Sequence, residues 1–154
     1  MKAIVCADNE NNIGYKNQLL LRIPEDMKYF KSATMNHTII MGKNTFLSMG
    51  GRQLPGREMV VLSKTLDGSQ YPFIKLYSSI ANMIFDVPDD SFVIGGGQIY
   101  AAMMDYVDEI LVTRILAALD GDTKFPELPK DDWNLTQGDT FYKFIDSEKE
   151  EYLY

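Results

Sequence analysis

The sequence is poor in cysteine, histidine and basic residues. Its 154 residues include one cysteine, Cys6, and one histidine, His37, so neither an internal disulfide nor a Cys/His zinc set can form. Lys and Arg number 15 against 22 Asp and Glu, which gives a net charge of −7 and a pI near 4.6. A chain so acidic lacks the basic surface that nucleic acids and anionic membranes require. A small anionic ligand remains possible, because it needs only a few converging cations.

Long hydrophobic runs are also missing. The amino-terminal apolar run covers only residues 3–7, and no stretch approaches the ~18 apolar residues of a membrane helix. We therefore expect a cytoplasmic protein without a signal peptide. Hydrophobic residues at 45% and charged residues at 24% are typical of a globular domain. The length predicts one domain over residues 1–154.

Short apolar runs alternate with segments of helical spacing. Strands are predicted at 3–7, 38–41, 59–62, 92–94 and 110–113, and several of these lack polar alternation, as strands buried on both faces do. Helices are predicted at 24–33, 43–48, 80–85 after Ser79 as a cap, and 98–105. The aromatic tail, 133–154, is interpreted as an antiparallel pair at the sheet edge. The pattern predicts an α/β fold with a largely parallel sheet.

Three glycines, Gly95, Gly96 and Gly97, stand between a predicted buried strand and a helix. Glycine allows close backbone approach, and free N–H groups at a helix start attract phosphate. A phosphate site and a simple tight turn are about equally compatible with this motif alone. It is not the dinucleotide-binding fingerprint, because Tyr100 replaces the third glycine of that pattern.

A second strand-to-helix turn contains Gly42, Lys43 and Asn44 and superficially resembles a P-loop. The pattern fails, because His37 replaces its first glycine and Asn44 its Ser or Thr. What remains is a cation, Lys43, at a helix start. Taken alone, it is more simply a surface lysine.

One carboxylate and two arginines are further candidates for a site. Asp26 lies four residues before Phe30 on the first predicted helix, so both side chains share one face with Met27 nearby. A carboxylate beside apolar groups can have a raised pKa, although an acid in a first turn also complements the helix dipole. Arg52 and Arg57 bracket a predicted turn, where an arginine suits bidentate recognition of a carboxylate. A surface arginine is the simpler alternative.

Six blocks, in order, make the whole chain resemble dihydrofolate reductase. The blocks are Asn12-Ile13-Gly14; Ile23-Pro24-Glu25-Asp26 with Phe30; Met41-Gly42-Lys43-Asn44-Thr45-Phe46; Leu54-Pro55-Gly56-Arg57; Val93-Ile94-Gly95-Gly96-Gly97-Gln98-Ile99-Tyr100; and Gly121-Asp122-Thr123-Lys124-Phe125-Pro126.

The resemblance implies a single-domain fold with a mostly parallel eight-stranded sheet, about four flanking helices and an antiparallel carboxy-terminal edge. It also implies a monomeric enzyme that reduces 7,8-dihydrofolate to 5,6,7,8-tetrahydrofolate for one-carbon metabolism. NADPH would be the cofactor, with no metal, and antifolate inhibitors would bind in the substrate site.

By the same resemblance, Asp26, Leu21 and Thr113 are the expected catalytic residues, with Asp26 binding the pterin and promoting its protonation at N5. Thr113 would link to this acid, and Arg57 would clamp the α-carboxylate of the glutamyl tail. The expected substrate-binding residues are Ile4, Val5, Asp26, Met27, Phe30, Lys31, Met49, Arg52, Leu54, Arg57, Ile94 and Thr113.

The resemblance also implies a cofactor site, in which Lys43 and Lys64 could favour NADPH by facing its 2′-phosphate. The expected cofactor-binding residues are Cys6, Ala7, Ile13, Gly14, Asn17, Leu19, Gly42, Lys43, Asn44, Thr45, Leu62, Ser63, Lys64, Ile94, Gly95, Gly96, Gly97, Gln98, Ile99, Tyr100 and Thr123.

Two departures distinguish this chain from the family pattern. Leu20-Leu21 stands where the family usually has Pro-Trp, so no indole can hold a water near the acid, and Gln98 stands where a basic residue is common.

Two alternative functions are a pyrimidine reductase of flavin biosynthesis, which would not need Asp26 or Arg57, and a non-catalytic nucleotide-binding module.

Overall fold

A computed structural model describes residues 1–128, 132–133, 142–144 and 151–153. Its strands are β1 (Lys2–Ala7), β2 (Asn12–Gly14), β3 (Thr38–Gly42), β4 (Glu58–Leu62), β5 (Ile74–Tyr77), β6 (Phe92–Gly95), β7 (Glu109–Ile115), β8 (Thr123–Lys124), β9 (Tyr142–Phe144) and β10 (Glu151–Leu153). Its helices are α1 (Pro24–Thr34), α2 (Lys43–Ser48), α3 (Ile80–Met83) and α4 (Gly97–Met103), with short 3₁₀ turns η1 (Gly68–Gln70) and η2 (Met104–Tyr106).

The main sheet has the strand order β5-β4-β3-β6-β1-β7-β10-β9. The first six strands are mutually parallel, and β10 and β9 add an antiparallel edge. The predicted α/β class, the parallel sheet and the antiparallel edge are thus confirmed for the described residues. Six strands of this sheet are parallel, and β2 and β8 form a second, two-stranded antiparallel sheet that the sequence did not predict.

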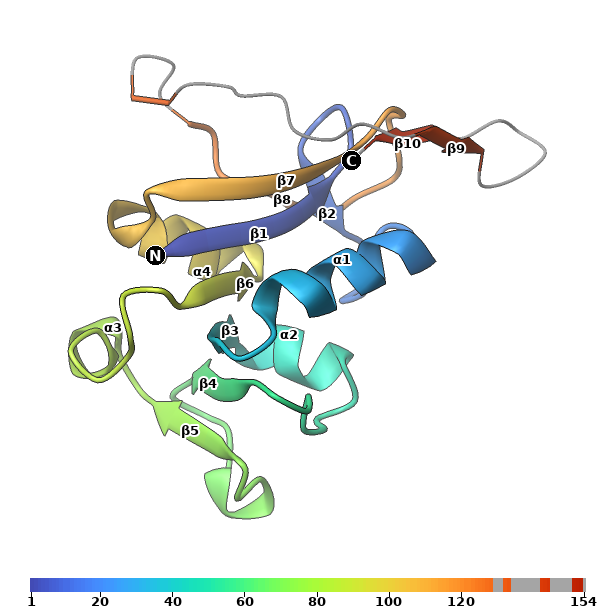
Figure 1. Ribbon diagram of the computed structural model, residues 1–154. Coiled ribbons are helices and arrows are strands. Elements are labelled where there is room, and N and C mark those ends of the chain that lie inside the picture. The colour runs from blue at the N-terminus through green and yellow to red at the C-terminus, as the bar shows by residue number, and fades with distance from the viewer. Residues whose placement is uncertain (129–131, 134–141, 145–150, 154) are drawn as a thin grey trace.

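Helices cover both faces of the parallel strands, as Figure 1 shows. Alternate residues of a strand point to opposite faces, so one strand can pack against helices on both sides of the sheet. Ile39 and Met41 of β3 pack in one cluster with Phe46 of α2 and Phe30 of α1. Ile40, between them in sequence, packs on the other side in a cluster that contains residues of α3 and α4. The runs without polar alternation are therefore strands buried on both faces, as predicted.

Strand β5 and helix α3 are among the elements that differ from the sequence prediction. Strand β5 is missing from the sequence prediction, because Lys75 interrupts the apolar run of its sequence Ile-Lys-Leu-Tyr. Helix α3 ends at Met83, two residues earlier than expected, and leaves Phe85 91% exposed. Its predicted cap is confirmed, since Ser79 Oγ accepts the Asn82 N–H at 3.2 Å.

The parallel order places three chain turns side by side. Strands β3, β6 and β1 are neighbours, so their carboxyl ends at Gly42, Gly95 and Ala7 reach the same edge of the sheet. Ligands of open α/β sheets bind at such an edge. In the part of the chain that the structure describes, no helix is long and apolar enough to cross a bilayer.

Candidate active site

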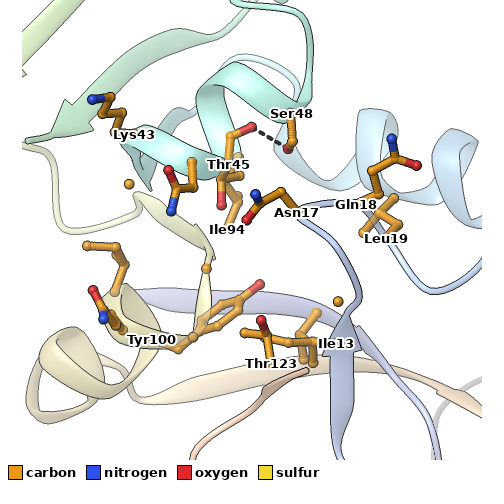
Figure 2. A pocket seen from close by; sticks show the side chains of 18 of the residues that line it. Ile13, Asn17, Gln18, Leu19, Lys43, Thr45, Ser48, Ile94, Tyr100 and Thr123 are labelled. Carbon is orange, nitrogen blue, oxygen red and sulfur yellow. Dashed lines mark hydrogen bonds between the residues drawn. The ribbon is translucent and has the colours of Figure 1, made fainter. Parts of the chain in front are cut away.

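A cavity of about 820 Å³ opens at this edge. It lies between the starts of α2 and α4, and the segment after β2 borders it opposite them (Figure 2). Its lining residues are Val5, Cys6, Ile13, Gly14, Asn17, Gln18, Leu19, Gly42, Lys43, Asn44, Thr45, Ser48, Leu62, Ser63, Thr65, Ile94, Gly96, Gly97, Gln98, Ile99, Tyr100, Asp122, Thr123 and Lys124.

Most of the residues expected to bind a cofactor line this one cavity. The exceptions are Ala7, which is buried in the core; Gly95, which is buried at the end of β6; and Lys64, which is exposed. The cavity also contains residues that the sequence analysis missed: Gln18, Ser48, Thr65, Asp122 and Lys124. Most are sequence neighbours of predicted residues, and Ser48 lies one turn after Thr45 on α2, so helical spacing could have identified it.

One end of the cavity is cationic and rich in hydroxyl groups. Lys43 Nζ donates to Thr65 Oγ1 at 3.0 Å. Ser63 Oγ accepts the backbone N–H groups of Thr65 and Leu66 at 3.1 and 3.0 Å, which fixes the loop that follows β4. A lysine held beside two hydroxyl groups can bind an anionic oxygen.

The glycine turn brings backbone close to the cavity. A side chain on Gly97 would meet Lys124 O and Thr123 Cγ2 at 3.0 Å, and one on Gly42 would meet Ile99 at 2.9 Å. Gly95 has a φ of +112°, and the Gly95–Gly96 peptide bond is cis. Neither Gly42 nor Gly96 caps its helix through a side chain, so the first turns of α2 and α4 receive no side-chain cap at the cavity.

Asp26 meets the sheet where β1 and β7 pair. Thr113 Oγ1 donates to Asp26 Oδ1 at 2.6 Å, and the register places Cys6 of β1 directly beside Thr113. Burial raises the pKa of Asp26, while hydrogen bonds from Thr113 and Cys6 lower it, and the net shift is upward. Burial and the neighbouring carboxylate raise the pKa of Cys6, so its thiol stays protonated and can donate. This carboxyl group is therefore predisposed to take up a proton.

An apolar wall and a cation accompany this carboxyl group. Phe30, Met49 and Leu54 pack with Ile4 and Ile94 in one cluster. Arg57 approaches the Phe30 ring with its Cζ 6.0 Å from the centroid. Its Nε donates to Pro55 O at 3.1 Å and its Nη1 to Thr34 Oγ1 at 3.4 Å, and both acceptors are neutral. Arg57 is thus oriented by its own turn, with its charge still available for an anion.

The remaining predicted substrate and catalytic residues are placed as follows. Met27 is 41% exposed, and Lys31 and Arg52 are exposed, so none of the three is packed into the core. Leu21 packs in a separate cluster with Ile23 and Ile115. It also borders a hollow of about 500 Å³ beside Leu19 and Leu20. Of the predicted substrate residues only Val5 and Ile94 line the larger cavity.

Comparisons with known proteins agree on one family. A family model described as dihydrofolate reductase matches residues 1–154. The chain is 36% identical over 138 residues to a dihydrofolate reductase of Bacillus subtilis, covering 88% of this chain and 81% of the relative. It is 38% identical over 133 residues to the type 9 enzyme of Escherichia coli, covering 80% and 75%.

A solved structure is similar over almost the whole length. It is a dihydrofolate reductase from Enterococcus faecalis complexed with NADP(H) and RAB-propyl. Its TM-score to this chain is 0.79 at 27% sequence identity, and the match covers 99% of this chain and 92% of the other.

Proposed function

The chain belongs to the dihydrofolate reductase family, and from this premise we propose which of its residues bind and protonate the substrate. It is an NADPH-dependent oxidoreductase that reduces 7,8-dihydrofolate to 5,6,7,8-tetrahydrofolate. Each named relative is a dihydrofolate reductase, which favours this activity over a pyrimidine reductase or a non-catalytic nucleotide-binding module.

The larger cavity fits NADPH. Its size suits an extended dinucleotide, and Gly42, Gly96 and Gly97 line it with backbone that no side chain covers. Lys43, with Thr65 and Ser63 beside it, would hold the phosphate of the adenosine end. Ile13, Gly14 and Cys6 would line the nicotinamide end. Bound NADPH supplies the hydride, and the protein supplies alignment and a dry site.

Asp26 is proposed to bind the pterin and to promote its protonation at N5. Thr113 donates to Oδ1 of Asp26 and Cys6 also donates to the carboxylate, and the remaining lone pairs of its two oxygens can accept the amino and ring N–H groups of a pterin. Because burial raises the pKa of Asp26, the group holds a proton more readily than an exposed aspartate. With Leu21 in place of the family's tryptophan, a water between carboxyl group and substrate would lack an indole partner and would depend on Asp26 and Thr113.

Arg57 is proposed to bind the α-carboxylate of the glutamyl tail. Its turn and the Phe30 ring hold the guanidinium at one end of the apolar wall, where the benzoyl part of a folate would lie. Lys31 and Arg52, both exposed, would contribute charge further out along the tail. Antifolate inhibitors would occupy the same site.

We further propose that the enzyme acts as a cytoplasmic monomer without nucleic-acid partners, in keeping with its net charge of −7.

The single observation that supports the proposal best is the 2.6 Å hydrogen bond between Thr113 and Asp26, and Asp26→Asn tests it. We expect this variant to bind NADPH normally but to reduce dihydrofolate ~10² to 10⁴-fold more slowly at pH 7. The loss should shrink at lower pH, where solution acid can protonate the substrate.

The assay follows nicotinamide absorbance during turnover from pH 5 to 8. Asp86→Asn is the matched control, because Asp86 is an exposed aspartate that accepts the Tyr77 hydroxyl group at 3.0 Å near strand β5. Near-normal turnover of Asp26→Asn at pH 7 would refute the role of Asp26. It would leave the family membership intact.

A further inference from the structure

The turn between β1 and β2 is built around a buried carboxylate, that of Asp8. Asp8 has no exposed surface, and its two oxygens accept four N–H groups. Oδ1 accepts the backbone N–H groups of Glu10 at 2.9 Å and Asn12 at 2.8 Å. Oδ2 accepts Asn12 Nδ2 and the backbone N–H of Leu119, both at 2.9 Å. None of these four hydrogen bonds involves Asp26, Arg57 or the residues to which those two side chains are hydrogen-bonded.

These contacts join two loops that are distant in sequence. The Leu119 amide belongs to the loop after β7, and Asn12 Nδ2 also donates to Leu119 O at 3.2 Å. Asn9 N donates to Ala117 O at 3.0 Å. From β7 itself, Arg114 Nη1 donates to Asp8 O at 2.7 Å and to Asn11 Oδ1 at 2.8 Å. We call the place where the β1–β2 turn meets the loop after β7 the junction, and Asp8 contacts both of these loops.

The chain that leaves the junction enters the cavity wall. Asn12 begins β2, and the following residues Ile13 and Gly14 line the cavity, as do Asn17, Gln18 and Leu19 after them. Figure 2 shows Asn17 near Thr45 and Ser48 of α2, with Gln18 and Leu19 further along the same segment. The segment 15–19 is itself exposed, so its position depends on where β2 is anchored and on the hydrogen bond from Lys16 N–H to Asp122 Oδ2 at 2.9 Å.

We propose that Asp8 is a positioning residue for cofactor binding, which fixes the segment 13–19 against the cavity by tying the β1–β2 turn to the loop at Leu119. The inference rests on the proposed assignment of the cavity to NADPH. Asp8 does not line the cavity, so it acts through the chain that it anchors.

A carboxylate is the group that this junction needs. All four partners are donors, and an ionised carboxylate only accepts. An asparagine would place an NH₂ group in the position of one oxygen. If that group took the place of Oδ2, it would face two further donors, Asn12 Nδ2 and Leu119 N–H. Burial would raise the pKa of Asp8, but the hydrogen bonds from Asn12, Leu119 and Glu10 together lower it, so the carboxylate stays ionised at neutral pH.

The test is the affinity of Asp8→Asn for NADPH and, separately, for a pterin antifolate in the absence of cofactor. We expect the NADPH dissociation constant to rise roughly tenfold, the lower range for losing hydrogen bonds to a charged group. Antifolate affinity should stay within about twofold of wild type, because the Asp26 and Arg57 contacts are made by other elements.

Two further variants keep the result interpretable. Asn12→Ala removes one donor to Asp8 and the bond to Leu119 O, so we expect a smaller rise, roughly threefold, and it takes over the test if Asp8→Asn does not fold. Ser79→Ala removes the cap of α3, away from the cavity. It should lower the thermal stability without changing NADPH affinity.

Three results would overturn the inference. The first is unchanged NADPH affinity in the folded variants at positions 8 and 12. The second is an equal loss of antifolate affinity, and the third is the same loss in Ser79→Ala, since either would reveal a merely structural role. Failure of the wild-type protein to bind NADPH would instead refute the cofactor assignment of the cavity, and the inference with it.

Discussion

At Asp26, two opposing influences act on one carboxyl group. Removal from water favours the protonated form, whereas donation by Thr113 and Cys6 favours the ionised form. The balance is an upward pKa shift, which suits a group that must bind a pterin and hold a proton near it. The helical spacing of Asp26 and Phe30 made this acid a candidate from the sequence. The partnership with Thr113, 87 residues away, came only from the family resemblance, because no local pattern encodes a contact between a helix and a distant strand.

Arg57 allows a prediction that separates the two ends of the substrate. We expect Arg57→Ala to weaken binding of folates with a glutamyl tail by about ten- to a hundredfold, since a charged hydrogen-bonded pair contributes roughly 1.5–3 kcal/mol. Pterins without the tail should bind to the variant almost as tightly as to the wild-type protein.

Titration calorimetry with tailed and tailless ligands measures this difference. The tailless ligand serves as the internal control, because truncating Arg57 also removes its contact with the Phe30 ring. An equal loss for both ligand classes would contradict the role of Arg57 as a carboxylate clamp.

At the level of elements, the sequence predicted the buried strands far better than the short ones. Strands β3 and β4 are continuous apolar runs, and their predicted bounds differ from the structure by one residue. Strands β2 and β8 have three and two residues, and what pairs them is a long-range contact rather than a local pattern. The antiparallel tail was predicted from its aromatic residues, and β9 and β10 confirm it, while Phe141, Ile145 and Tyr154 lie outside the described residues.

The segment between β2 and α1 carries the departure from the family pattern, Leu20-Leu21. Leu21 is half buried in an aliphatic cluster with Ile23 and Ile115, so its packing can exclude water but offers no hydrogen-bond donor. We expect Leu21→Trp to fold and to change either antifolate affinity or the pH profile of turnover, because an indole N–H near Asp26 could hold a water there.

Leu21→Phe is the matched control, since it adds a ring without an N–H group. Kinetics from pH 5 to 9 and inhibitor titrations compare the two variants. If neither property changes in Leu21→Trp, or if Leu21→Phe changes both equally, hydrogen bonding at this position does not influence the reaction.

For the whole molecule, the raised pKa of Asp26 links activity to stability. A carboxyl group with a raised pKa stabilises the folded state below its unfolded pKa of about 3.9 and loses that contribution as pH rises through the folded value. Asparagine does not titrate. We therefore expect ligand-free Asp26→Asn to be more stable than wild type at pH 7, although it is less active.

Urea unfolding at several pH values measures this difference. The gap in unfolding free energy should open above about pH 4 and close below it. Asp8, whose pKa is lowered, has the opposite dependence and loses its contribution at acid pH, but it is present in both proteins and cancels in the comparison. A variant less stable than wild type at pH 7 and equally so at pH 4 would contradict the prediction.

The central place of β1 has a consequence for how the chain is made. Strand β1 ends at Ala7, yet its partners are β6, which begins at Phe92, and β7, which begins at Glu109. On the ribosome, its apolar residues must wait for most of the chain to emerge before they can pair. Distant pairing of this kind slows folding and leaves apolar strands open to association. During translation, the strand that will bear Cys6 beside the active-site acid is thus exposed to association until both of its partners have emerged.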